Sequence, residues 1–241
     1  MENRILPRKL QFLSGSMLKL IAVLAMVLDH SALILASVFP EMGVPFFTLL
    51  GRSISVYYIM RKIGRLAFPI FCYLIAEGYC HTRKPLVYML RLALFAVLSE
   101  IPFNLMISGS LFYDGKQNVY VTLLMGVVLL FVFDKVKNNL LKLICMGIVI
   151  VLAKLLKADY GLIGVLLIFL LYALRKHPVA QALLAYPFLS GGIAAWCSFG
   201  VIAAYNGKRG FASSGFWKYV FYIFYPAHIM ILLGVRYFLQ N

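Results

Sequence analysis

The chain has 241 residues, of which 63% are hydrophobic and only 13% are charged, and its mean hydropathy is +0.92. Because soluble domains are about half apolar and about a quarter charged, this composition excludes a soluble enzyme, a disordered chain and a disulfide scaffold, and it leaves a polytopic membrane protein. The net charge of +15 would suggest nucleic acid binding in a soluble protein, but in a membrane protein it reflects topology first and an anionic ligand at the lipid surface second, so no nucleic acid partner is expected.

The apolar runs predict an all-α fold, a polytopic transmembrane helix bundle of about eight spans. We expect a single integral-membrane domain over residues 1–241, because no loop is long enough to hold a soluble domain. The first apolar stretch has no small-residue cleavage site, so it is expected to be a retained span rather than a signal peptide. The predicted spans are residues 18–39, 63–80, 86–107, 118–134, 139–157, 159–175, 179–204 and 216–239.

The segment 40–62, between the first two spans, is apolar but interrupted. Pro40 and Gly43 break it early, and Arg52 in its middle would be costly in hydrocarbon. Although residues 44–60 are long enough for a ninth span, we expect an interfacial or re-entrant segment here.

The placement of Lys and Arg predicts that the N-terminus lies in the cytoplasm. With eight spans in that orientation, thirteen of the 23 basic residues lie on the cytoplasmic side, a modest bias. The basic N-terminus and the tight clusters Arg83-Lys84, Lys135/Lys137 and Arg175-Lys176 favour the same side. Since the number of predicted spans is even, both termini are expected to be cytoplasmic.

The pair Asp29-His30 falls near the middle of the first predicted span, where ionisable residues are functional candidates. Adjacent residues project about 100° apart on a helix, so one can line a cavity while the other contacts a neighbouring helix. A neutral imidazole at this depth suits a general base. The alternative is a pair that joins helices through partners such as Arg65 or Arg91.

The end of the second predicted span carries Glu77 and His81 at i and i+4, followed by Arg83 and Lys84. No third ligand accompanies the first two, so a cap or a ligand contact is favoured and no metal is expected. The basic turn can hold a phosphate-rich ligand or serve as a topological anchor.

The third predicted span contains Arg91 and Glu100, nine residues apart, so each needs a partner on another helix. Pro102 is expected to kink this helix and present Asn104 to a cavity. Asn118 and Thr122, at i and i+4, can donate to a developing oxyanion or hydrogen-bond between helices.

The last predicted span places Tyr222, Tyr225 and His228 along one helical stripe, with Pro226 inside it. An aromatic belt explains the tyrosines but not the histidine. His228 is therefore a second candidate acid–base or structural residue.

Several segments occur in the order and spacing of one known family, and the sequence resembles the TraX family over roughly residues 17–240. These segments are LDH, IGRLAFPIF, AEGYCHTR, SEIPFN, QNVYVTLL, DYGLIG and FYPAH. The family's named representative N-acetylates the amino terminus of conjugative pilin. The resemblance therefore implies an acyltransferase-like bundle in the bacterial inner membrane that uses acetyl-CoA from the cytoplasm. Residues 40–60 look longer than in the common pattern.

The resemblance and the polar residues together predict a site. The acceptor is an amine of a protein or peptide, or a glycan hydroxyl, and His30 deprotonates it with a carboxylate of another helix orienting the imidazole. Asn104 or Asn118 stabilises the oxyanion. The family positions carried over also include Glu100. The expected catalytic residues are His30, Asp29, Glu77, Asn104, Asn118 and His228, and the expected acetyl-CoA-binding residues are Arg65, His81, Arg83, Lys84 and Arg91.

Two other functional classes stay open. In a small transporter the same buried charges would mark a proton or anion path, although the chain has no paired halves. In a non-catalytic assembly factor for a secreted or pilus subunit they would only join helices. Acetyl-CoA consumption distinguishes an enzyme from both.

Overall fold

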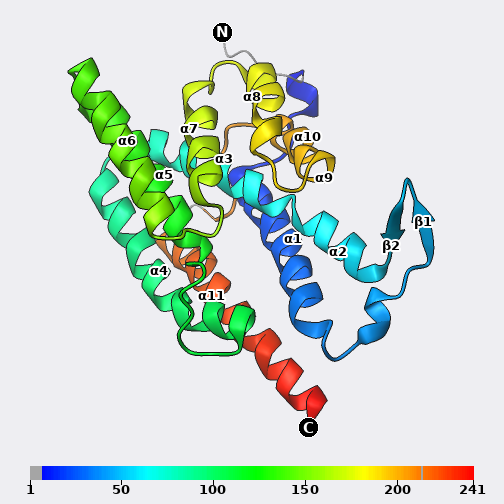
Figure 1. Ribbon diagram of the computed structural model, residues 1–241. Coiled ribbons are helices and arrows are strands. Elements are labelled where there is room, and N and C mark those ends of the chain that lie inside the picture. Colours follow the sequence, from blue (N-terminus) through cyan, green and yellow to red (C-terminus); the bar gives the residue numbers. More distant parts are fainter. Residues whose placement is uncertain (1–6, 213) are drawn as a thin grey trace. The chain divides into compact units, whose positions relative to one another are not determined.

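The computed structural model describes residues 7–212 and 214–241 (Figure 1), and the chain divides into two compact units. Within the described residues, unit 1 comprises 71–188, and unit 2 comprises 7–70 with 189–212 and 214–241. The prediction of a helical protein is confirmed, with one short β-hairpin as the exception in the part described.

Unit 1 is built from helices that follow one another with short connections. They are the larger part of α3 (Ala67–His81), α4 (Pro85–Ser108), α5 (Val119–Lys135), α6 (Asn139–Leu155), α7 (Gly161–Ala173), α8 (Pro178–Ala185) and the turn η3 (Tyr186–Phe188). Prolines at the first turns of α4 and α8 suit positions whose backbone N–H has no partner inside the helix.

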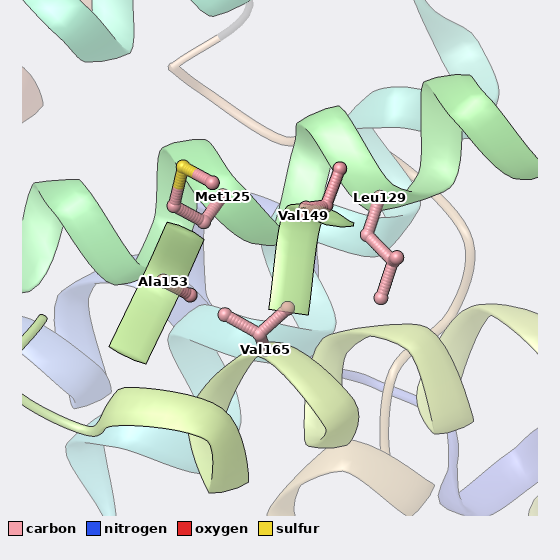
Figure 2. Close-up of a cluster of buried hydrophobic side chains, with 5 residues drawn as sticks. All are labelled: Met125, Leu129, Val149, Ala153 and Val165. Carbon is pink, nitrogen blue, oxygen red and sulfur yellow. The ribbon is translucent and has the colours of Figure 1, made fainter. Parts of the chain in front are cut away.

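The core of unit 1 includes a cluster of buried side chains from α5, α6 and α7, drawn in Figure 2 as Met125, Leu129, Val149, Ala153 and Val165. Gly126 lets α5 approach α7 closely, because a Cβ there would lie 2.4 Å from Ile168 Cδ1. This packing fixes the helix ends that carry the polar residues of unit 1.

Unit 2 contains the turns η1 (Arg8–Leu10) and η2 (Pro40–Gly43), the long helices α1 (Gly15–Leu35) and α11 (Gly215–Gln240), and the short α2 (Val56–Gly64), α9 (Ile193–Trp196) and α10 (Ser198–Ala203). The start of α1 is held by a loop that precedes α11. Gly15 N donates to Lys208 O at 2.8 Å and Ser16 N donates to Arg209 O at 2.9 Å. These carbonyls satisfy N–H groups that a helix leaves unpaired at its N-terminus.

The two long helices of unit 2 run parallel (α1 blue, α11 orange to red in Figure 1). Lys19, near the start of α1, lies over the ring of Phe221 near the start of α11, and His30 further along contacts His228 further along. Two parallel helices that both cross a membrane end on the same side, so an odd number of crossings separates the N-terminus from the C-terminus. If both helices span, the two termini lie on opposite sides, in contrast to the expectation of two cytoplasmic termini, which stays a prediction.

The predicted span 179–204 is also wrong as one helix. Its residues form α8, η3, α9 and α10 instead. Pro187 has no backbone N–H to continue the helix, and Gly192 adopts φ 59° and ψ −138°, a conformation that only glycine reaches without strain.

Three helices of the described part are long and apolar enough to cross a membrane: α1, α4 and α11. They match the predicted spans 18–39, 86–107 and 216–239. Large apolar side chains face outward on them, including Leu24 of α1 at 56% exposure and Val97 of α4 at 75%. Such faces are typical of contact with lipid. The helices α5 and α6, with 17 residues each, are shorter, so the count of eight spans stays a prediction.

Residues 44–60 do not form a ninth helix. They contain the antiparallel hairpin of β1 (Phe47–Leu49) and β2 (Arg52–Ile54), and then the start of α2. The turn between the strands places Leu50 and Gly51 at positive φ, 50° and 73°. A hydrogen bond from Arg52 lowers the pKa of the Tyr58 hydroxyl and joins the hairpin to α2. The expectation that this segment lies at the membrane interface stays a prediction.

Candidate functional site

Two histidines of unit 2 meet at the contact between α1 and α11. Nδ1 of His30 lies 2.7 Å from Nε2 of His228, with the ring centroids 5.0 Å apart and the ring planes inclined by 9°. Two nearly coplanar rings whose edge nitrogens are this close lie edge to edge, so the shared hydrogen lies in the plane of both rings. The two residues that the sequence offered as alternative bases therefore form one pair.

A backbone carbonyl fixes the direction of that hydrogen bond. Nδ1 of His228 lies 2.8 Å from Phe224 O, and since a carbonyl oxygen only accepts, this Nδ1 carries a hydrogen. In a neutral His228 the other nitrogen, Nε2, is then an acceptor, so His30 donates through its Nδ1–H. The neutral pair therefore leaves Nε2 of His30 with a free lone pair, the form that a general base requires.

Aromatic rings surround the His30–His228 pair. The ring of Phe224 lies parallel to His228 at 5.2 Å between centroids, and Tyr225 meets the edge of His30 at 6.0 Å. His228 is 5% exposed, whereas His30 is only half-buried. The buried ring thus braces the accessible one. The predicted stripe of Tyr225 and His228 is confirmed in this respect.

Asp29 points away from His30 and pairs with a residue that the sequence analysis did not select. Its Oδ2 lies 2.6 Å from Nη1 of Arg61, on α2. Its Oδ1 is buried without a hydrogen-bond partner and is pressed against Gly64, where a Cβ would lie 2.5 Å from that oxygen. This ion pair and the bare glycine hold α2 against α1. Asp29 thereby holds the Arg61 guanidinium beside the residue that precedes His30, the candidate base.

Of the two expected partners of the Asp29-His30 pair, Arg65 lies near enough to attract the Asp29 carboxylate, but the ion pair is formed by Arg61. The side chain of Arg65 packs on Gly191, where a Cβ would come within 2.6 Å of its own Cβ. Arg91, in unit 1, donates through Nε to Val87 O and lies 6.0 Å from the centroid of the Tyr88 ring. The contact that orients His30 comes from the imidazole of His228, so the predicted carboxylate partner was wrong.

In unit 1, Glu100 and Asn118 come together as structural partners. The side-chain nitrogen of Asn118 donates to Glu100 Oε2 and to Ala96 O, both at 2.7 Å, and its oxygen accepts from Tyr120 N. Asn118 is the N-cap of α5, completely buried. Both amide hydrogens are already donated, so in this arrangement Asn118 has none left for an oxyanion.

Asn104 lies in the same helix as Glu100 and is almost completely buried. Its Nδ2 donates to Leu111 O at 2.9 Å, while its Oδ1 has no partner. This contact uses one of the two amide hydrogens, so the second can still donate and the oxyanion role of Asn104 stays a prediction. Thr122, the other predicted donor, accepts from Tyr160 N at 3.3 Å.

The end of α3 carries Glu77 and His81 on one helical face, as predicted. His81 Nδ1 lies 2.9 Å from Glu77 O and 3.7 Å from Glu77 Oε1. Arg83 and Lys84 follow as exposed side chains before α4. Across residues 7–212 and 214–241, no three His, Cys, Asp or Glu side chains gather as a metal site needs.

The sequence analysis did not identify a second cluster of polar side chains in unit 1. The Tyr172 hydroxyl donates to the Asp134 carboxylate, with distances of 2.8 and 2.9 Å to its two oxygens, and the Arg175 guanidinium lies 4.4 Å from the Tyr172 ring centroid. Asp134 and Tyr172 are 38 residues apart, so no local pattern announces the contact. Arg61 was missed for the same reason.

Comparison with known proteins agrees with the resemblance seen in the sequence. No solved structure matches the chain. A curated protein named "Probable fimbrial assembly protein FimC, serogroup H1", from Dichelobacter nodosus, is 28% identical, over 94% of this chain and 97% of its own length. The profile of the family described as TraX protein matches residues 14–236. With nearly its whole length matched, the chain belongs to the TraX family.

Proposed function

We propose that the chain is a membrane-embedded acyltransferase that moves an acetyl group from cytoplasmic acetyl-CoA to an amine of a peptide or protein, or to a hydroxyl. The observation that carries this proposal is the contact of His30 with His228, because it leaves the lone pair of His30 Nε2 free. We place the protein in a bacterial cytoplasmic membrane with its N-terminus inside.

The chemistry follows from that lone pair. The acceptor nitrogen attacks the thioester carbonyl carbon of acetyl-CoA and loses a proton to His30 Nε2. The tetrahedral intermediate collapses, the C–S bond breaks, and the coenzyme A thiolate takes the proton back from His30. His228 stabilises the imidazolium of His30 by holding its Nδ1–H. The products are an N-acetyl group and free coenzyme A.

The oxyanion of the intermediate needs a donor, and Arg61 is better placed for it than Asn118. Its Nη1 contacts both Oδ2 and, at 3.5 Å, the backbone oxygen of Asp29, the residue before His30. A guanidinium has five N–H donors, so this pairing leaves others to meet developing negative charge.

The name of the Dichelobacter nodosus relative supports a fimbrial or pilus subunit as the acceptor. The acetyl-CoA contacts expected from the sequence are His81, Arg83, Lys84 and Arg91 in unit 1 and Arg65 in unit 2, and they stay predictions.

The test is acetyl transfer by the purified protein, followed by mass spectrometry with labelled acetyl-CoA and candidate peptide and glycan acceptors. We expect His30→Ala to lower kcat by about a thousandfold, the usual range of a general base, with the protein still folded. His177→Ala is the matched control, since His177 is exposed at the start of α8. Equal activity of the two variants would refute the role of His30.

A non-catalytic assembly factor is the second candidate, and the relative's name favours it equally. It predicts no acetylated product and normal pilus assembly in cells that carry His30→Ala. An acetylated subunit that disappears with this substitution excludes it.

A further inference from the structure

We propose a phosphate-binding site for the acyl donor on the loop Asn206–Gly210 of unit 2, formed by Lys208 and Arg209 at the start of α1. The proposal rests on the proposed acetyl-CoA-dependent function, and it names a site that the sequence patterns did not select.

The backbone of the loop is held firmly against α1. Besides the contacts of Gly15 and Ser16, the Ser16 hydroxyl donates to Arg209 O at 2.6 Å and accepts from Ala212 N at 2.8 Å. Gly210, at φ 81°, fits tightly against Ser14, where a Cβ would lie 2.2 Å from the hydroxyl oxygen. The carbonyls face the helix, and the side chains of Lys208 and Arg209 are exposed. Two cations are thus presented on a rigid support.

Few acidic residues of unit 2 are available to balance the positive charge of Lys208 and Arg209. Residues 189–241 contain no Asp or Glu, and residues 6–70 contain only Asp29 and Glu41. Asp29 lies on the far half of α1, and Glu41 lies beyond its C-terminal end. The first turn of α1 has no acidic residue, although helices favour anions at their N-termini and disfavour cations there. The exposed Lys208 and Arg209 side chains at this position can therefore attract an anionic ligand.

The distance to His30 selects the kind of anion. His30 and the loop belong to the same unit, and the 14 residues from Ser16 to His30 rise about 21 Å along α1. This length is comparable to the extended pantetheine arm that joins the phosphates of coenzyme A to its thioester. A donor whose phosphates bind Lys208 and Arg209 can therefore place its acetyl group at His30.

The experiment compares the Michaelis constants of two acetyl donors for Lys208→Ala/Arg209→Ala. Acetyl-CoA carries the phosphates and acetyl-pantetheine lacks them. We expect the KM for acetyl-CoA to rise on the order of tenfold with kcat unchanged, and the KM for acetyl-pantetheine to stay constant. The matched control is Lys137→Ala/Lys154→Ala, which removes two exposed charges from unit 1. The backbone carbonyls that hold α1 are present in all variants.

Direct binding of 3′,5′-ADP, measured by calorimetry in uncharged detergent, separates the failure of this site from the failure of the proposed function. Binding that is lost in Lys208→Ala/Arg209→Ala supports the site even if no acetyl is transferred. An unchanged KM and unchanged nucleotide binding overturn it. An equal rise of KM for both donors also overturns it, because the loop would then act only by supporting α1. A KM effect that requires anionic lipid in the vesicles overturns it in favour of lipid headgroups.

Discussion

The two units treat buried polar groups differently. In unit 1 the amide of Asn118 uses its oxygen and both its hydrogens on α4 and α5, so it closes a helix start and offers nothing to a ligand. In unit 2 the hydrogen bonds run in one direction, from His30 Nδ1 through His228 to the carbonyl of Phe224, and they leave Nε2 of His30 with a free lone pair. The comparison teaches that burial and polarity do not mark a reactive group. A reactive group needs a donor or acceptor that is both unused and accessible, as Nε2 of the half-buried His30 is, unlike the buried Oδ1 of Asn104.

The largest expected effect concerns membrane topology, in which the units also differ. Helices of unit 1 follow one another along the chain, whereas α1 and α11 of unit 2 are far apart in the sequence and run parallel. We expect alkaline phosphatase fused after Asn241 to be active and a cytoplasmic reporter fused there to be silent, since an odd number of crossings separates the termini. A reporter at the N-terminus should give the reverse pattern. Two cytoplasmic termini would mean that α1 and α11 do not both span.

The different expectations for the side of the C-terminus show what the sequence could and could not predict. Helix positions follow from apolar runs, and α1, α4 and α11 match three predicted spans closely. A hydropathy pattern does not say which segments cross, so 179–204 was counted as a span although Pro187 and Gly192 break it. Removing one span from the predicted eight changes the side on which the C-terminus is expected.

In the candidate site, too, some residues could be predicted from the sequence and others could not. Asp29, His30 and His228 are found from sequence because ionisable residues are rare in apolar runs. Their partners are not, because Arg61 is 32 residues from Asp29 and His228 is 198 residues from His30. Asn118 has the right chemistry for an oxyanion donor, but only its contacts with Ala96 and Glu100 reveal that its hydrogens are used.

The next largest effect is expected at His228. Removing its ring in His228→Ala leaves Nδ1–H of His30 without an acceptor, and we expect kcat to fall about a hundredfold. In His228→Gln the side-chain oxygen can reach the place of Nε2 and accept the same hydrogen, so activity should recover about tenfold. Steady-state kinetics with a pH profile check this. If Gln and Ala variants are equally impaired, the acceptor role of His228 is wrong and its ring serves only packing.

Asn118→Ala tests whether the buried amide of unit 1 serves stability rather than catalysis. The substitution removes the cap of α5 and leaves the Glu100 carboxylate without this donor, so we expect about 3 kcal/mol of lost stability with kcat per folded molecule unchanged. Asn138→Ala is the control, because the Asn138 side chain caps α6 at an exposed position and accepts from Leu141 N, which should limit its loss to about 1 kcal/mol. Reversible unfolding in mixed micelles measures both. A hundredfold loss of kcat in a stable Asn118→Ala protein would restore the oxyanion role.

The smallest effect is expected from a single methyl group at Gly64. In Gly64→Ala the new Cβ would lie 2.4 Å from the Cβ of Asp29, so α2 must shift and strain its ion pair with Arg61. We expect a loss of about 2 kcal/mol, the usual cost of overpacking. Gly147→Ala in α6 makes the same chemical change where nothing lies within 4 Å of the new atom, and it should stabilise unit 1 by about 0.5 kcal/mol, since alanine favours helix. A loss of stability in Gly64→Ala together with a gain in Gly147→Ala would show that Asp29 acts as a spacer between α1 and α2. The spacer would keep its neighbour His30 facing His228. Equal stability of the two variants would mean that α1 and α2 can separate freely at this point, and the geometry of the His30–His228 pair would then have to depend on α11 alone.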